Sequence, residues 1–267
     1  MAKISEESRL HFSKAVQPYK DKITATLEKE KTMLNGMHKG DIDYEQKKIL
    51  LCEDMIYVSS LYVAINTLSL KIMEVKNNDA LNDARKILYK AIIYLEDIVT
   101  DGIDISFSEL TPYLTRIQSV TIARRYTIIK KLGLSITILK DALGENSKWK
   151  WSFVELEGRY AAVAKNFIDM KESVKDYIDP RAQNYETTVL YIRLITKLLD
   201  DSATSYRDRY ELSTRRIDDM RNGIKFLLAL RKLDIAIGNS EQAEEVKKKA
   251  LVWKDKMDAD QKSGLSK

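Results

Sequence analysis

The sequence has little of the material from which sheets, disulfide frameworks and histidine-based metal sites are built. Its 267 residues include nine glycines, three prolines, two histidines and one cysteine. So few glycines and prolines leave little for the tight turns that sheets require, and we therefore expect an all-α protein. The single cysteine, Cys52, excludes an intrachain disulfide, and its place in an apolar helical pattern predicts a buried, unreactive thiol.

The common motifs of catalysis are also missing. Neither His11 nor His38 belongs to a Glu-x-x-His or His-Glu-x-x-His sequence, and no glycine-rich nucleotide-binding loop is present. The acidic run that starts at Asp41 resembles the first half of a calcium loop, but Gln46 stands where that loop requires glycine. We therefore expect no enzyme activity, no cofactor and no metal site.

Long apolar runs are absent as well. The amino terminus is polar and lacks the apolar segment of a signal peptide. The longest uncharged stretch, residues 55–70, contains five serine, threonine or asparagine residues and falls short of the ~20 apolar residues that a membrane span needs. We expect no transmembrane segment and predict a cytoplasmic protein with this stretch as a central, buried helix.

What the sequence does contain is helical periodicity. Between residues 153 and 177, eight apolar or aromatic residues alternate at spacings of three and four: Phe153, Leu156, Tyr160, Val163, Phe167, Met170, Val174 and Tyr177. Residues at these spacings lie on one face of an α-helix, so the pattern predicts one continuous helix of roughly seven turns. The same rhythm recurs over residues 81–98 and 217–227.

Turn signals divide the chain into about seven to nine mostly long, antiparallel helices. Pro18 predicts a kink or a break in the first helix, and the polar stretch 200–216 predicts an exposed helix or an interruption near 202–205. No repeat of 30–50 residues is evident, so a long-helix bundle is favoured over the alternative, an irregular α-solenoid. We expect one helical domain over residues 1–260, or two sub-bundles that meet near 100–112, followed by a frayed tail at 261–267.

Positive charge is concentrated in residues 113–151. This region holds eight basic and two acidic residues, a balance of +6, whereas the whole chain carries +5. If residues 112–143 form one helix that continues through Gly133, four of these cations fall within about a third of its circumference and six aliphatic residues lie opposite. The cations are Arg116, Arg124, Lys130 and Lys131, and the aliphatic residues are Ile128, Ile129, Leu132, Ile136, Leu139 and Leu143.

Together with Lys148 and Lys150, these four cations form a candidate surface for an acidic partner. The competing expectation is that acidic residues of neighbouring helices neutralise them within the fold. A second stretch mixes aromatic and arginine side chains with nearly balancing carboxylates, which is typical of a protein interface. Its candidate residues are Tyr206, Arg207, Tyr210, Arg215 and Arg216.

Three classes of function are compatible with these features. The first is a non-enzymatic cytoplasmic scaffold or adaptor that binds a protein partner and is able to self-associate into a homo-oligomer. The alternative is a helical nucleic-acid-binding protein that uses the basic 113–151 region. A peripheral membrane module ranks last, because no terminal amphipathic helix with bulky exposed apolar residues supports it.

Overall fold

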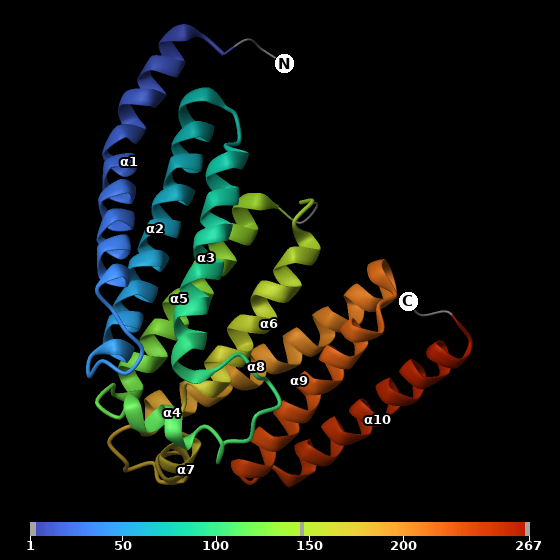
Figure 1. Ribbon diagram of the computed structural model, residues 1–267. Helices are drawn as coiled ribbons and strands as arrows, with labels where there is room; N and C mark the ends of the chain where they lie inside the picture. The colour runs from blue at the N-terminus through green and yellow to red at the C-terminus, as the bar shows by residue number, and fades with distance from the viewer. Residues whose placement is uncertain (1–3, 145–146, 265–267) are drawn as a thin grey trace. The chain divides into compact units, whose positions relative to one another are not determined.

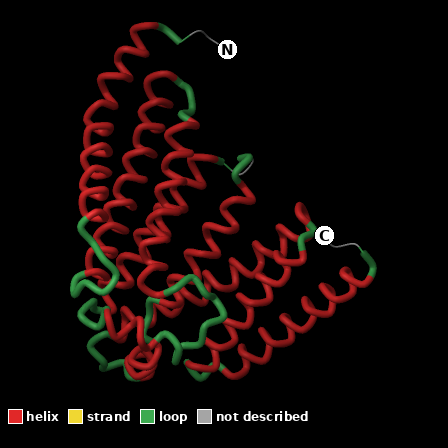
Figure 2. The backbone as a smooth tube through the Cα atoms, in the orientation of Figure 1, coloured by secondary structure: helices red, strands yellow, loops and turns green. Residues whose placement is uncertain are grey.

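The computed structural model describes residues 4–144 and 147–264, and in this part of the chain helices are joined by loops and turns (Figures 1 and 2). It forms ten α-helices and one π-helix, and no strand. These are α1 (Glu6–Asn35), α2 (Tyr44–Met73), α3 (Asn78–Val99), α4 (Thr111–Arg116), α5 (Ile122–Leu143), α6 (Lys150–Asn166), α7 (Met170–Ile178), α8 (Tyr185–Arg209), η1 (Tyr210–Thr214), α9 (Ile217–Ala236) and α10 (Ser240–Lys262). The predicted all-α bundle is confirmed, with more helices than expected because two predicted helices are each divided.

The predicted frayed tail lies only partly within the described residues. Helix α10 includes residues 261 and 262, a turn follows, and residues 265–267 lie outside the described part.

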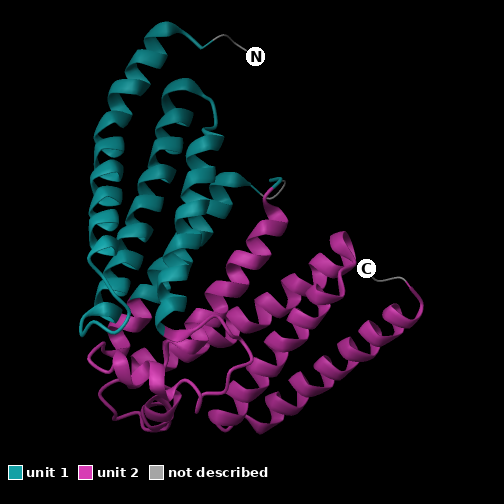
Figure 3. Cartoon of the chain, in the orientation of Figure 1, with its two compact units in different colours: residues 1–98, 128–148 teal, residues 99–127, 149–267 magenta. Residues whose placement is uncertain are grey.

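The chain divides into two compact units (Figure 3). Unit 1 comprises residues 1–98 and 128–148, and unit 2 comprises residues 99–127 and 149–267. The chain passes from one unit to the other three times, and the second passage falls inside α5. Whether these units count as one domain or two stays a prediction.

Unit 1 contains α1, α2, α3 and the greater part of α5. Helix α1 begins at its cap Ser5, whose side chain accepts a hydrogen bond from the backbone N–H of Ser8, and it runs without interruption through Pro18. Of the predicted kink or break at Pro18, the break is therefore wrong, and the kink stays a prediction. Pro18 is exposed, so the carbonyl group that loses its intrahelical partner there can bind water instead.

Helix α2 supplies much of the unit 1 core and buries Cys52 completely. By length and composition alone, α2 is also the one helix of the described chain that is long and apolar enough to cross a membrane. In the fold, 56% of its most apolar part is buried. The core helix of a soluble protein has the same properties.

A buried polar network joins the first three helices of unit 1. Glu30 of α1 is buried and receives hydrogen bonds from Lys90 Nζ, at 2.7 Å, and from the Tyr94 hydroxyl, both on α3. Lys48 of α2 lies 2.6 Å from an oxygen of Asp97 on α3. Burial and the hydrogen bond to Glu30 raise the pKa of Tyr94. Each buried charge here has a partner, as burial of charge requires.

In unit 2, α8 and α9 pack against each other, α10 packs on α9, and α6 packs on α8 (Figure 1). Of the two alternatives predicted for residues 200–216, the interruption near 202–205 is wrong, because α8 continues through these residues. Ser202 and Ala203 are buried, and the helix continues to Arg209 because its inner face keeps contact with neighbouring helices.

The helix predicted over residues 153–178 is divided in two. Helix α6 ends at Asn166, whose side-chain amide donates hydrogen bonds of 3.0 Å to the carbonyl oxygens of Thr100 and Gly102. Helix α7 then begins after Asp169, whose carboxylate accepts from two backbone N–H groups of its first turn. One continuous helix is therefore wrong, although Phe167, in the break, is fully buried as the spacing predicts.

Candidate partner-binding surface

The predicted basic face is not carried by one helix. Helix α4 ends at Arg116 and α5 begins at Ile122, with a turn between them. Arg116 therefore does not share a helix face with Arg124, and this prediction is wrong. The assumption that the helix continues through Gly133 is confirmed, because α5 runs through this residue.

A buried arginine closes the turn between α4 and α5. The guanidinium of Arg125 donates to the carbonyl oxygens of Ile117 at 2.7 Å, Val120 at 2.9 Å and Phe167 at 3.3 Å. Burial lowers the pKa of Arg125. Arg125, one of the eight basic residues of the 113–151 region, is thus part of the unit 2 core and binds both the turn between α4 and α5 and the break between α6 and α7.

The six predicted cations are not brought together in one unit. Arg116, Arg124 and Lys150 belong to unit 2, whereas Lys130, Lys131 and Lys148 belong to unit 1. Arg116 lies over the ring of Tyr113, and Lys150 lies over that of Trp151. Arg124, Lys130 and Lys148 also interact with other groups of the fold.

Lys131 is exposed and forms no ion pair with the described residues. On the same helix, Leu134 is 59% exposed and Ile138 is 44% exposed. Residues three and four apart are neighbours on a helix surface, so Leu134 lies beside Lys130 and Lys131, and Ile138 lies beside Leu134. We call these four residues, all in unit 1, the α5 surface.

The opposite side of α5 fixes this surface in place. The six aliphatic residues predicted to lie there are all buried: Ile128, Ile129, Leu132, Ile136, Leu139 and Leu143. The predicted apolar side of the helix is therefore confirmed. Leu134 and Ile138 are absent from the predicted site, although their signal is visible in the sequence as two large aliphatic residues outside this stripe.

The predicted aromatic and arginine interface is largely internal. Tyr206 is buried, with its ring stacked on Phe226 at a centroid distance of 5.5 Å. Tyr210 is fully buried, and its hydroxyl donates to a carboxylate oxygen of Asp260 at 2.7 Å. These two tyrosines belong to the core of unit 2 and do not form an exposed interface.

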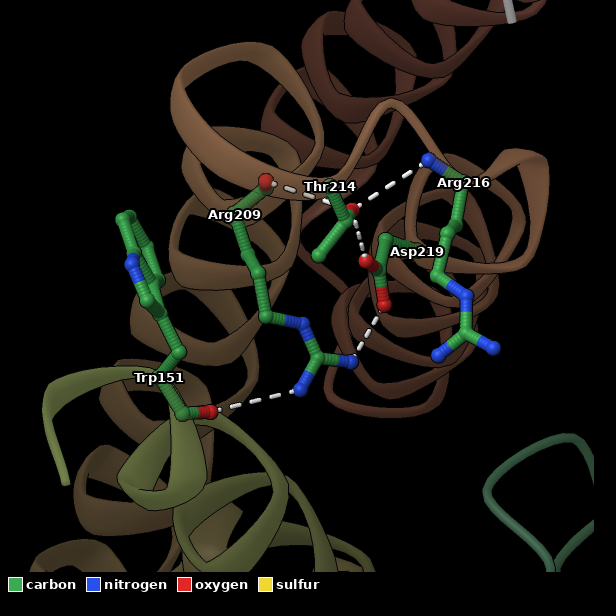
Figure 4. Close-up of polar contacts among 5 residues, drawn as sticks. All are labelled: Trp151, Arg209, Thr214, Arg216 and Asp219. Atoms are coloured by element: carbon green, nitrogen blue, oxygen red, sulfur yellow. Dashed lines mark hydrogen bonds and ion pairs between the residues drawn. The ribbon is translucent and has the colours of Figure 1, made fainter. Parts of the chain in front are cut away.

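The arginines of this stretch hold η1 and the helices around it. Arg209 reaches the carbonyl oxygen of Trp151 with one nitrogen, at 3.3 Å, and the buried carboxylate of Asp219 with another (Figure 4). The hydroxyl of Thr214 bonds to the second oxygen of Asp219 and accepts from the backbone N–H of Arg216 at 3.2 Å. Arg209 and Asp219, which organise this network, belong to the same stretch but are not among the predicted interface residues.

Three predicted interface residues remain at least partly accessible. Arg207 is half-buried, pairs with Glu211 at 3.1 Å and lies over the ring of Trp253. Arg215 and Arg216 are exposed, and Arg215 has a left-handed backbone with φ of 53°. Arg207 thus has partners within unit 2, and the two exposed arginines directly precede α9.

Lys165 has the side chain whose chemistry is most typical of an enzyme. It is fully buried, and burial lowers its pKa to about 8. Its Nζ donates to the carbonyl oxygen of Ile105 and to the side-chain oxygen of Asn166 at 3.1 Å. The amine is thus engaged in holding the 99–110 segment against the end of α6. Within residues 4–144 and 147–264, no three His, Cys, Asp or Glu side chains are grouped as metal ligands.

Comparison with known proteins gives one family. The model of the TP0443 family matches residues 8–261 of the chain. No curated protein and no solved structure matches the sequence.

Proposed function

We propose that this chain, which belongs to the TP0443 family, is a non-enzymatic cytoplasmic helical scaffold or adaptor that binds an acidic protein partner through the α5 surface. The observation that carries the proposal is the pairing of Leu134 and Ile138, both exposed, with two neighbouring lysines on one rigid helix. An aliphatic centre with a charged edge is typical of a protein interface.

The apolar area, the preformed helix and the positive charge of the α5 surface all favour the binding of a partner there. Removing the exposed parts of Leu134 and Ile138 from water would contribute about 1 kcal/mol for each side chain. Because the other side of α5 is buried, the helix needs no ordering before it binds. Carboxylates of a partner would be attracted to Lys131, which raises the association rate and favours acidic proteins. A second copy of the same surface would be repelled, so we favour a different protein over self-association here.

The proposal is tested with tagged protein incubated in an extract of its native host, with and without nuclease. A partner should be captured by the wild type and lost with Leu134→Asp combined with Ile138→Asp. The matched control is Leu251→Asp combined with Val252→Asp, since these α10 residues are exposed to a similar degree, 52% and 65%. Lys131→Glu should weaken capture most at low salt.

Two outcomes would contradict the α5 surface. One is equal capture of the partner by the wild type and by the Leu134, Ile138 variant when both are folded by circular dichroism. The other is recovery of nucleic acid, read at 260 nm, with partners that disappear after nuclease treatment. The second result would instead support the alternative proposal of nucleic-acid binding through residues 113–151.

A further inference from the structure

Unit 2 contains a pocket of about 590 Å³ lined by residues of α7, α8, α9, α10 and the turn before α10. Three of its lining residues are aliphatic and buried: Ile192 of α8, Leu230 of α9 and Val246 of α10. Its accessible edge carries exposed polar side chains, among them Arg193 and Glu245. The pocket therefore has an apolar interior and a polar entrance, which is the usual character of a ligand site.

One buried carboxylate lines this interior without a partner. Asp234 lies in the last turn of α9 and is only 1% exposed. Its Oδ2 atom forms no hydrogen bond with the described residues, and none of their lysines or arginines forms an ion pair with it. The carboxyl end of a helix carries partial negative charge, so its position adds to the cost of an anion there.

The charged side chains that line the pocket sum to zero only when Asp234 is included. Three cations line it, Arg193, Lys197 and Lys249, together with three carboxylates, Asp200, Glu245 and Asp234. Lys249 lies 2.8 Å from Asp200, which satisfies both. Of the six charged groups, Asp234 alone is buried, so the interior of the pocket is suited to a cation even though the five groups nearer the entrance carry a net charge of +1.

We propose that this pocket binds a primary ammonium group carried on an aliphatic stem, with Asp234 as its counter-ion. The stem would lie against Ile192, Leu230 and Val246, and the ammonium would donate hydrogen bonds to the free carboxylate oxygen. A metal ion would need further oxygen ligands beside Asp234, and the described chain groups no such set there. The ammonium could belong to a free amine or to a lysine side chain of another protein.

Burial raises the pKa of the Asp234 carboxyl to about 6. At pH 8 this group is therefore ionised while a primary amine remains protonated. The test is a ligand-observed NMR titration of the full chain at pH 8 with pentylamine, and with pentanoate as a probe of the same stem and opposite charge. Pentylamine should bind and pentanoate should not. Asp234→Asn should weaken pentylamine binding at least tenfold, whereas Glu245→Gln, at the entrance, should change it less than twofold.

A second variant keeps the test decisive if Asp234→Asn does not fold. Val246→Phe places extra atoms in the pocket while leaving the carboxylate intact, and it should also abolish pentylamine binding. Nα-acetyl-lysine methylamide distinguishes the two sources, since its competition with pentylamine would show that a protein lysine can enter and its failure would restrict the site to free amines. Equal binding of pentanoate and pentylamine, or undiminished pentylamine binding by folded Asp234→Asn, would overturn the proposal.

Discussion

Gly158→Ala should destabilise the protein, although the same change usually stabilises a helix. Gly158 lies in α6, where the ring of Tyr206 from α8 comes close to its backbone. A Cβ atom at position 158 would lie 2.7 Å from Cε2 and 2.9 Å from Oη of that ring. The ring has little room to retreat, because it is buried, stacked on Phe226 and covered by the guanidinium of Arg209 at 4.8 Å.

The expected magnitude follows from three opposing effects. Replacing glycine by alanine inside a helix gains about 1 kcal/mol. Overpacking a filled core costs about 1–3 kcal/mol, and disturbing an aromatic stack costs about 0.5–1.5 kcal/mol. The sum is a loss of about 2 kcal/mol in the free energy of unfolding.

Urea denaturation followed by circular dichroism measures this loss directly. Gly36→Ala is the matched control, since φ is −100° there and the added Cβ would meet only Thr32 O, at 3.9 Å. We expect the control to stay within about 0.5 kcal/mol of the wild type. Adding Tyr206→Leu to Gly158→Ala should cost less than the sum of the two single changes. If Gly158→Ala alone is as stable as the wild type, the close approach of α6 and α8 is refuted.

Three further changes test other parts of the fold. Since the pKa of Asp234 is about 6 in the fold and 3.8 is its ordinary value, the wild type should lose about 2 kcal/mol of stability from this group between pH 4.5 and 7.5. The Asp234→Asn variant should not show this loss. Urea denaturation at both pH values measures it, and a difference in the free energy of unfolding between variant and wild type that is the same at pH 4.5 and pH 7.5 would contradict the prediction. Arg125→Met removes the three hydrogen bonds that the guanidinium donates to carbonyl groups of buried residues and should cost about 3 kcal/mol. Exposed Lys131→Met should cost under about 0.5 kcal/mol, and equal effects of the two changes would count against the role of Arg125. Phe167→Asp buries an unpaired charge and should abolish helical circular dichroism, and an unchanged spectrum would disprove the burial of Phe167.

Periodicity was sufficient to predict the helical class and much of the core. The apolar side of α5 is buried as its spacing predicts, and so are Phe153, Leu156, Tyr160 and Val163 in α6. These predictions depend only on which residues share a helix face, which the sequence states directly. They do not depend on where a helix ends or on what lies beside it.

Helix ends were predicted less well where distant residues determine them. Asn166 ends α6 through carbonyl groups of Thr100 and Gly102, more than sixty positions earlier in the chain. Arg125 holds the turn before α5 through Phe167, 42 positions later. The spacing from Arg125 to Ile128, Ile129 and Leu132 places it on the apolar side of α5 and separates it from exposed Arg124, but no local signal identifies the carbonyl groups that it binds.

In the predicted aromatic and arginine interface, local charge suggests exposure where the spacing of apolar residues indicates burial. Charged neighbours make residues 200–216 look like a solvated surface, yet Leu199, Ala203, Tyr206 and Tyr210 continue the buried stripe of α8 at spacings of four, three and four. That spacing could have identified both tyrosines as core residues. The unpartnered state of Asp234 could not have been predicted, because it depends on which side chains of three helices fail to reach it.

The division of α5 between the two units has a consequence for synthesis of the protein. Residues 1–98 leave the ribosome first, but unit 1 also needs residues 128–148, which include the buried aliphatic side of α5. At roughly 5–20 residues per second, the interval between residues 98 and 148 lasts about 3–10 s. During that time the apolar faces that α5 will cover remain open to chaperones and to other nascent chains. A truncated chain that ends at residue 98 should retain that exposure permanently and aggregate.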